Sequence, residues 1–405
     1  MAVKQGYKQT EVGVIPDDWS TVLLDSIANR GSGHTPNKKI KAYWNGEIKW
    51  ISLKDSDRLD KRFVFDTCDK VTCEGIANSS AVLHPAGTVV LSRDAGVGKS
   101  AIMSDSMAVS QHFIAWYCGN TLHNLFLYYW LQLNKKEFER IAIGNTIKTI
   151  GLGYFRNLRI PYPNIAEQVA IAEALSDADA LIESIEQLIT KKRQIKQGAM
   201  QELLNPKEGW EKVKLGRLGV FLKGSGVKKD ESMSGNIPCI RYGEIYTKHK
   251  NYIKAFDSWI SPAVAATAKR IKSGDILFAG SGETKEEIGK CVAFVDDIEA
   301  YAGGDIVILR PNNANSLFLG CYLNTESVNR QKASKGQGDA VVHIGSNALA
   351  DIDLIIPPVD EQAFIASVLF DMDAEIGALE AKLEKALQLK QGMMHNLLTG
   401  KIRLA

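Results

Sequence analysis

One long segment of the sequence occurs twice. Glu167-Gln168 recurs as Glu361-Gln362, 194 positions later (361 minus 167). Without a gap, the same shift aligns Lys196-Gln197-Gly198 with Lys390-Gln391-Gly392. Identities this dense do not arise from composition, so the chain contains an internal duplication. Two similar structural halves are therefore expected.

Each copy carries an apolar stripe with a seven-residue period, and no proline interrupts it. The pattern predicts two long helices, 166–206 and 359–400, and the matched residues alone would form a rod of ~57 Å. Because the stripes match in length, we expect the helices to pack antiparallel against each other. Packing of each helix on its own domain is the alternative. The residues expected at the helix-pair interface are Ile171, Leu175, Ile182, Ile185, Ile189, Leu203, Ile365, Leu369, Ile376, Leu379, Leu383 and Leu397.

The segments between the helices are rich in short β-like runs bounded by Gly, Asn and Asp. They also contain helical runs at 125–133 and 316–324, so each half is predicted to be a mixed α/β domain. We expect an α/β protein with a pseudo-twofold internal repeat, in which two such domains are joined by two long antiparallel coiled-coil helices. The predicted domains are 1–165 and 207–358, and a C-terminal tail, 401–405, follows the second helix.

Composition excludes some classes of protein. The six cysteines form no C-x-x-C pair, which argues against a disulfide scaffold or a zinc ribbon and fits a reducing cytoplasm. No apolar run reaches the ~18 residues of a membrane span. The net charge of +2 neither demands nor excludes nucleic acid, so any basic surface must be local.

Several short motifs resemble enzyme signatures. Gly96 to Ser100 resembles the end of a phosphate-binding loop, but Arg93 stands where that motif requires glycine. Phe278 to Gly282 matches the F-x-G-x-G of adenine methyltransferases, but their Pro-Pro-Tyr/Phe segment is missing from the sequence. The histidines show no metal-ligand spacing, so no catalytic or metal site is expected. A stand-alone adenine DNA methyltransferase or nuclease remains the alternative function, and a scaffold without a DNA role is a third.

Four segments together carry a family resemblance. They are Val12 to Trp19, Ile160 to Gln168, Pro357 to Gln362 and Leu397 to Arg403. In combination they resemble the specificity subunit of type I restriction-modification enzymes, and the resemblance covers essentially the whole chain.

The resemblance implies a non-catalytic, sequence-specific DNA-binding subunit. In that family each target-recognition domain reads one half of a split site in double-stranded DNA, and the helices set the gap between the halves. The helices also carry two methyltransferase subunits, which restriction/translocase subunits join. The resemblance thus places S-adenosylmethionine, ATP and magnesium on partner subunits, and no cofactor on this chain.

DNA contacts are expected from Arg, Lys, Gln, Asn and His side chains on the loops of each domain. The candidates are Lys54, Arg93, Lys99, Gln111, Asn145, Lys148, Arg241, Lys285, Lys290, Gln337 and His343.

Overall fold

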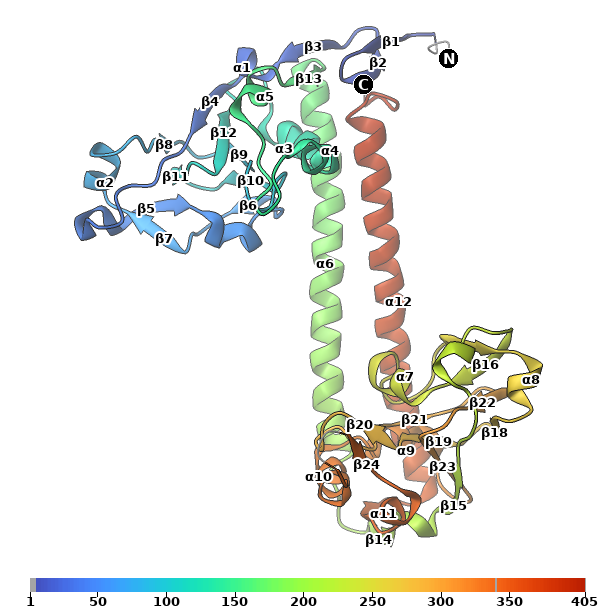
Figure 1. Ribbon diagram of the computed structural model, residues 1–405. Coiled ribbons are helices and arrows are strands. Elements are labelled where there is room, and N and C mark those ends of the chain that lie inside the picture. The colour runs from blue at the N-terminus through green and yellow to red at the C-terminus, as the bar shows by residue number, and fades with distance from the viewer. Residues whose placement is uncertain (1–4, 339–340, 405) are drawn as a thin grey trace. The chain divides into compact units, whose positions relative to one another are not determined.

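The computed structural model describes residues 5–338 and 341–404, so residue 405 of the predicted tail lies outside the described part. The chain forms two compact units, residues 1–187 with 381–405 and residues 188–380. We call residues 5–164 the first domain and residues 204–358 the second domain (Figure 1).

The first domain contains thirteen strands and five α-helices, with short 3-10 helices at Lys41–Tyr43 (η1) and Leu53–Arg58 (η2). Its strands are β1 (Tyr7–Thr10), β2 (Gly13–Pro16), β3 (Ser20–Leu23), β4 (Asn29–Ser32), β5 (Trp44–Ile51), β6 (Phe63–Val64), β7 (Asp69–Val71), β8 (Leu83–His84), β9 (Val89–Ser92), β10 (Ser100–Met103), β11 (Met107–Val109), β12 (Phe113–Tyr117) and β13 (Arg159–Tyr162). Its α-helices are α1 (Leu24–Ile27), α2 (Cys73–Ala77), α3 (Asn124–Leu133), α4 (Lys135–Ile141) and α5 (Leu152–Arg156).

The described part of the second domain repeats this plan. Its strands are β14 (Glu211–Lys214), β15 (Gly219–Lys223), β16 (Ile237–Ile240), β17 (Ser258–Ile260), β18 (Lys269–Ile271), β19 (Ile276–Ala279), β20 (Ser281–Gly282), β21 (Cys291–Ala293), β22 (Ala300–Ala302), β23 (Ile306–Pro311), β24 (Val342–His343) and β25 (Asp353–Ile356). Its helices are α7 (Tyr242–Thr247), α8 (Pro262–Ala265), α9 (Ser316–Tyr322), α10 (Glu326–Lys335) and α11 (Ser346–Ala350), with 3-10 turns at Leu215–Arg217 (η3) and Lys229–Glu231 (η4).

The two domains share one topology. The strand order β4-β12-β9-β10 of the first domain corresponds to β15-β23-β19-β21 of the second. Likewise β7-β5-β11-β8 corresponds to β17-β16-β22-β18, and the pair β13-β3 corresponds to β25-β14. The duplication predicted from the helical segments therefore extends through both domains, which confirms the α/β fold with an internal repeat.

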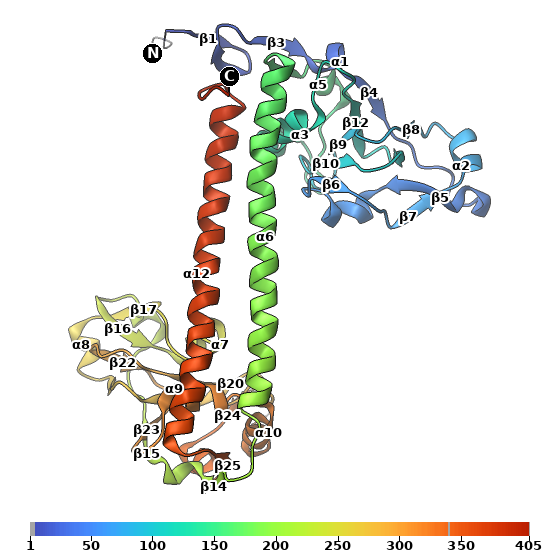
Figure 2. The same cartoon turned by 180° about the vertical axis from the view of Figure 1, so that it is seen from behind.

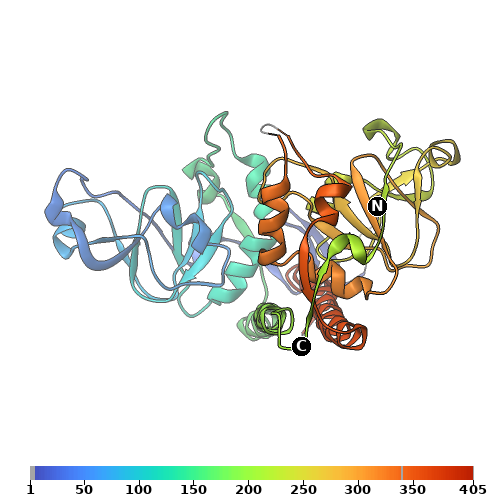
Figure 3. The ribbon, with the colours of Figure 1, turned by 90° about the horizontal axis from the view of Figure 1, so that it is seen from below.

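The larger hydrophobic core of each domain lies between a sheet and a long helix, and a smaller one lies away from that helix. In the first domain the fully buried strand β9 and the buried residues 113–116 of β12 face α3, whose Phe126, Leu127 and Tyr129 are also buried. Helix α3 lies between this sheet and α6 (Ile165–Leu203), as the view from behind shows (Figure 2). In the second domain, Figure 3 looks nearly along α12 (Val359–Leu397) and shows the strands on one side of that helix.

The ends of α6 and α12 pack on the cores of the domains, but each helix contributes to both cores, unlike the alternative in which each helix packs on its own domain alone. Ile171, Leu175 and Leu397 belong to the core of the first domain, whereas Ile365, Leu369 and Leu203 pack with the core of the second. The middle of the stripe is buried outside the domain cores, at Ile182, Ile185, Ile189 and Ile376, which are at most 7% exposed. Leu379 and Leu383 are half-buried.

Lysines that interrupt the stripe form ion pairs between the two helices. In the first unit, Lys390 of α12 lies 2.5 Å from Asp179 of α6. In the second unit, Lys196 of α6 lies 2.6 Å from Asp373 of α12, and both side chains are at most 15% exposed. Because Lys196 and Asp179 correspond to Lys390 and Asp373 in the repeat, each lysine meets the aspartate of the other copy. In both ion pairs a residue near the N-terminal end of one helix contacts a residue near the C-terminal end of the other, which confirms the antiparallel packing.

The segment after α12 contacts the beginning of the first domain. The hydroxyl of Tyr7 donates to the carbonyl of Gly400 at 3.2 Å. Arg403 donates to both oxygens of Asp18 at 2.7 Å and to the buried carboxylate of Glu167 at 2.5 and 2.9 Å. Trp19 lies below the guanidinium, 5.7 Å away, and also donates to Glu167. The C-terminal segment thus completes the first unit.

Candidate nucleic-acid interface

Two loops of the first domain lie against each other. The first glycine turn (residues 93–99) joins β9 to β10, and the first tip loop (residues 143–149) follows α4. The amide of Ile150 donates to the carbonyl of Arg93 at 3.0 Å, and the Thr149 hydroxyl donates to the Asp94 carboxylate. The glycine turn therefore fixes where the tip loop leaves the domain.

The second domain contains the same pair of loops. The second glycine turn (residues 280–290) joins β19 to β21, and the second tip loop (residues 337–343) follows α10. The amide of Ile344 donates to the carbonyl of Gly280 at 2.9 Å. The hydroxyl of Ser281 lies 2.9 Å from Nδ1 of His343. The backbone anchor is the same as in the first domain, although the side chains differ.

Lys99 and Lys290 occupy corresponding positions, each directly before the strand that follows its glycine turn. The ammonium of Lys99 donates to the carbonyl and hydroxyl of Ser56, both at 3.0 Å. The ammonium of Lys290 donates to the carbonyl of Tyr246 at 3.0 Å, and burial lowers the pKa of Lys290. Both lysines thus tie the glycine turn to the short helix that follows β5 or β16.

Arg93 also bonds to its own domain. Its Nε donates to the carbonyl of Ile150 at 3.0 Å, and its Nη1 lies 3.4 Å from the carbonyl of Gln111. The side chain of Gln111 is exposed and accepts from the Thr35 hydroxyl at 2.6 Å. Arg93 therefore binds Ile150, the residue after the first tip loop, twice. The Arg93 carbonyl accepts from the Ile150 amide, and the Arg93 side chain donates to the Ile150 carbonyl.

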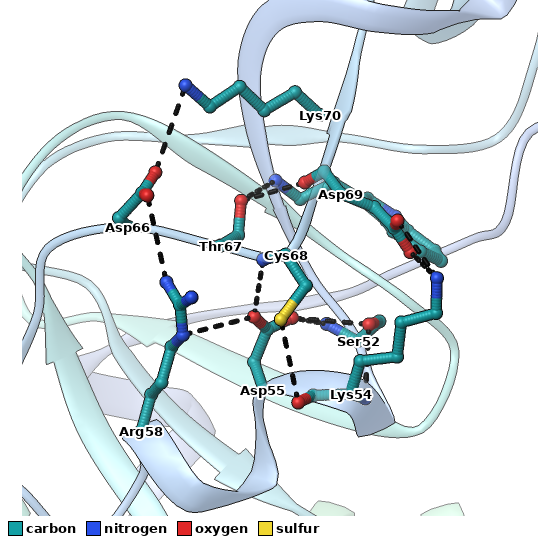
Figure 4. Close-up of polar contacts among 10 residues, drawn as sticks. Ser52, Lys54, Asp55, Arg58, Asp66, Thr67, Cys68, Asp69 and Lys70 are labelled. Carbon is teal, nitrogen blue, oxygen red and sulfur yellow. Dashed lines mark hydrogen bonds and ion pairs between the residues drawn. The ribbon is translucent and has the colours of Figure 1, made fainter.

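Lys54 lies at the edge of a polar cluster after β5 (Figure 4). It is exposed and forms an ion pair with Asp69 at 2.9 Å. At the centre of the cluster, the fully buried Asp55 accepts from the amides of Ser52 and Cys68 at 2.9 and 2.7 Å. The hydrogen bond to Asp55 is the main reason that the pKa of the Cys68 thiol is raised. The cluster fixes the turn that presents Lys54.

The remaining candidates differ in exposure. Arg241 is half-buried and lies at the start of α7. Burial raises the pKa of Glu244, and the charge of Arg241 opposes part of this rise. The others are exposed and lie on the tip loops or on the second glycine turn, namely Asn145, Lys148, Lys285, Gln337 and His343. The structure brings Arg93 and Lys148 to one pair of loops, and Lys285, Lys290, Gln337 and His343 to the corresponding pair. Their contacts with DNA stay predictions.

Sequence reasoning missed the apolar residues of the tip loops. Ile143 and Ile147 are 82% and 59% exposed, and Val341 in the second tip loop is 51% exposed. Gly144 and Gly338 lie 194 positions apart, the same shift that relates the two helical segments. This shared shift is the signal in the sequence that could have identified the two loops as corresponding parts of the repeat.

One enzyme-like motif lies in a turn between two strands and the other in β-strands. Ser100 begins strand β10, so no helix follows the first glycine turn as a phosphate-binding loop requires. Phe278 to Gly282 runs through the buried strands β19 and β20. Within residues 5–338 and 341–404, no group of three His, Cys, Asp or Glu side chains could hold a metal ion. The helices of this described part include none long and apolar enough to cross a membrane.

Residues 16–196 and 207–389 each match the type I restriction modification DNA specificity domain. The chain belongs to this family. Family members of this kind are the non-catalytic DNA-recognition components of type I restriction-modification systems. The resemblance noted in the sequence is therefore confirmed.

Individual relatives agree with this assignment. The MjaVIII specificity subunit of Methanocaldococcus jannaschii is 23% identical over 99% of this chain and 97% of its own length. The MjaIX specificity subunit of the same organism is 30% identical, but over 44% of this chain and 42% of its own length. The fold is similar to that of the type I S subunit of M. genitalium, with a TM-score of 0.59 at 15% identity over 98% of both chains.

Replacing both Arg93 and Lys99 with alanine is expected to weaken the binding of this protein to DNA. Because both side chains bond to carbonyls of their own domain, the loss should come from displacement of the first tip loop. The slope of affinity against salt concentration should then stay unchanged, since each direct phosphate contact adds about one unit to it. Salt-dependent binding measurements check this, and unchanged affinity would show that these residues do not support the interface.

Proposed function

We propose that each domain reads one half of a two-part sequence in double-stranded DNA, and that the chain carries two methyltransferase subunits and restriction/translocase subunits. The proposal rests on one observation. The two domains keep the same strand order and the same anchoring of their tip loops, while the side chains on those loops differ. One binding geometry with two sets of side chains suits two half-sites of different sequence.

The long helices have a separate role in this proposal. Helix α6 is one uninterrupted helix of 39 residues that belongs to the first unit at one end and to the second unit at the other. Its length would set the number of unread base pairs between the half-sites. S-adenosylmethionine, ATP and magnesium would act on the partner subunits, and the chain alone would neither methylate nor hydrolyse.

The helix length provides a direct test. Four residues inserted between Lys191 and Lys192 add about one turn, or ~6 Å, which is close to two base-pair steps of ~3.4 Å. A companion variant carries four further residues between Glu380 and Ala381 of α12, so that both helices are lengthened. Methylome mapping of a host that expresses the variant should show a longer spacer and unchanged half-sites.

A matched control inserts the same four residues at Asn120, in an exposed turn of the first domain. This control should leave the spacer as it is in the unmodified protein. Altered bases within a half-site, together with the original spacing, would contradict the role of the helices.

A further inference from the structure

Each tip loop has a glycine with a positive φ at the same position of the repeat. Gly144 has a φ of +139° and Gly338 a φ of +107°, values that other residues rarely adopt. A Cβ atom on Gly144 would lie 2.1 Å from the carbonyl oxygen of Ile147, and one on Gly338 would lie 2.2 Å from that of Val341. Both loops therefore require glycine at this position.

Each tip loop is also closed by the same two backbone hydrogen bonds. In the first loop, Ile143 and Thr149 exchange amide-to-carbonyl bonds of 3.0 and 2.9 Å. In the second, Gln337 and His343 exchange bonds of 2.9 and 2.7 Å. The first loop is thus a narrow two-stranded ribbon, and the described residues of the second loop are closed at their base in the same way. The anchors to the glycine turns fix where both loops leave their domains.

Each tip loop exposes a β-branched apolar side chain at the same position, among polar ones. Ile147 is 59% exposed and Val341, at the corresponding position, is 51% exposed. The first tip loop contains no acidic residue, and the exposed Lys148 follows Ile147 directly. In the first tip loop, a branched apolar side chain beside a cation suits a surface that is apolar at one point and negatively charged around it. The sequence of the second tip loop keeps the branched apolar residue, Val341, but contains Asp339 and no lysine.

DNA offers such a surface in its major groove. The groove is ~12 Å wide and admits a two-stranded β-ribbon, and its edges carry one apolar group, the C5-methyl of thymine. Phosphates line both sides of the groove. The minor groove, at ~6 Å, is too narrow for a closed ribbon of this kind.

We propose that Ile147 and Val341 each contact a thymine methyl group in the major groove, one in each half of the recognition sequence. This inference rests on the proposed function, because it requires that both domains read DNA. It assigns a specificity role to two residues that lack hydrogen-bonding side chains.

Uracil provides the test, because it pairs like thymine and lacks only the methyl group. The recognition sequence is first obtained by methylome mapping, and each thymine in a synthetic duplex is then replaced by uracil in turn. For the unmodified full chain, one replacement in each half should weaken binding about fourfold, since burial of one methyl group contributes ~0.8 kcal/mol.

The variants assign each methyl contact to its residue. Ile147→Ala should remove the discrimination between thymine and uracil in one half-site, and Val341→Ala should remove it in the other. Gly144→Ala should act like Ile147→Ala, because it distorts the turn that presents the isoleucine. Val82→Ala, which changes a 49% exposed apolar residue elsewhere in the first domain, should keep the discrimination in both halves.

Failure of this inference can be told apart from failure of the proposed function. Specific binding that tolerates uracil at every position, or a half-site without thymine, would overturn the methyl contact and leave the two-part recognition intact. Equal binding of thymine and uracil together with kinked DNA would indicate a wedge in the minor groove, which also overturns it. Binding without any sequence preference would overturn the proposed function itself.

Discussion

Replacing Arg403 with alanine will lower the free energy of unfolding of the first unit by about 2 kcal/mol. Arg403 faces Glu167, which is 5% exposed, and its loss leaves that carboxylate with the Trp19 indole as its remaining side-chain donor among the described contacts. Removal of one partner from a fully buried pair costs ~3–5 kcal/mol. Because the guanidinium is 35% exposed, we expect a smaller loss.

The effect can be measured by urea denaturation, with hydrogen exchange of the peptides around Trp19 and Glu167 locating it. Adding Glu167→Gln to the Arg403→Ala variant should recover part of the loss, because no unpaired charge then remains buried. An Arg403→Ala protein as stable as the unmodified chain would show that the C-terminal segment does not hold the first unit together.

The second copy of the repeat supplies a natural control. Trp210 and Glu361 correspond to Trp19 and Glu167, but Gly209 stands at the position of Arg403. The Trp210 indole lies 3.4 Å from Glu361, which is only half-buried. Glu361→Ala should therefore cost no more than ~1 kcal/mol.

The same contact makes the first unit sensitive to acid. The hydrogen bonds from Arg403 hold the pKa of Asp18 below its usual value. A carboxylate with a depressed pKa contributes stability above its unfolded pKa, and that contribution is lost as the pH falls through its folded pKa. The unmodified protein should lose this contribution at low pH, whereas the Arg403→Ala variant should show a smaller change, because the side-chain hydrogen bond from Arg403 is the largest cause of the lowered pKa.

The two long helices and the internal repeat could be predicted from the sequence because both depend on patterns that extend over many residues. The stripe through Ile171 and Ile185 required a long helix, and the shift of 194 required a second one. The short β-like runs expected in both domains are strands in the structure, among them the corresponding β9 and β19. Interruptions by Lys196 and Lys390 were visible, but their partners were not, because those lie on the other helix.

The candidate interface was less predictable, since charge alone does not show where a side chain points. Arg93, Lys99 and Lys290 carry the charge expected for DNA contacts, and the structure shows each of them bonded to a carbonyl of its own domain. Ile147 and Val341 carry no charge, so the sequence did not indicate them as candidates for DNA contacts. Their significance depends on backbone hydrogen bonds that become visible only once both loops are folded.

The largest expected loss of stability lies in the second domain. Asp275 is fully buried and accepts two hydrogen bonds from Arg310, at 2.8 and 2.7 Å. Its remaining described donor is the amide of Lys272 at 2.8 Å. Replacing Arg310 alone leaves this buried charge without its partner. Because Asp275 is fully buried but Arg310 is 32% exposed, we expect a loss of about 3 kcal/mol, at the lower end of the ~3–5 kcal/mol for a fully buried pair.

The first domain has uncharged residues at the two positions that correspond to Asp275 and Arg310. Thr88 and Tyr117 correspond to Asp275 and Arg310, because Val89 pairs with Trp116 as Ile276 pairs with Leu309. The buried Thr88 donates its hydroxyl to the carbonyl three residues earlier at 2.7 Å, within a turn that closes as it does at Asp275. A threonine at 275 can make the same bond to its own turn.

This correspondence defines a double-mutant cycle in which the second substitution repairs the first. Arg310→Tyr should lower the free energy of unfolding by ~3 kcal/mol, whereas Arg310→Tyr with Asp275→Thr should return to within ~1 kcal/mol of the unmodified protein. Asp275→Thr alone should fall between the two, because the 32% exposed Arg310 can turn to water. Urea denaturation of the four proteins gives the coupling energy directly. Strictly additive losses would mean that the pair contributes no buried charge interaction, and that the two copies of the fold do not tolerate exchange at this position.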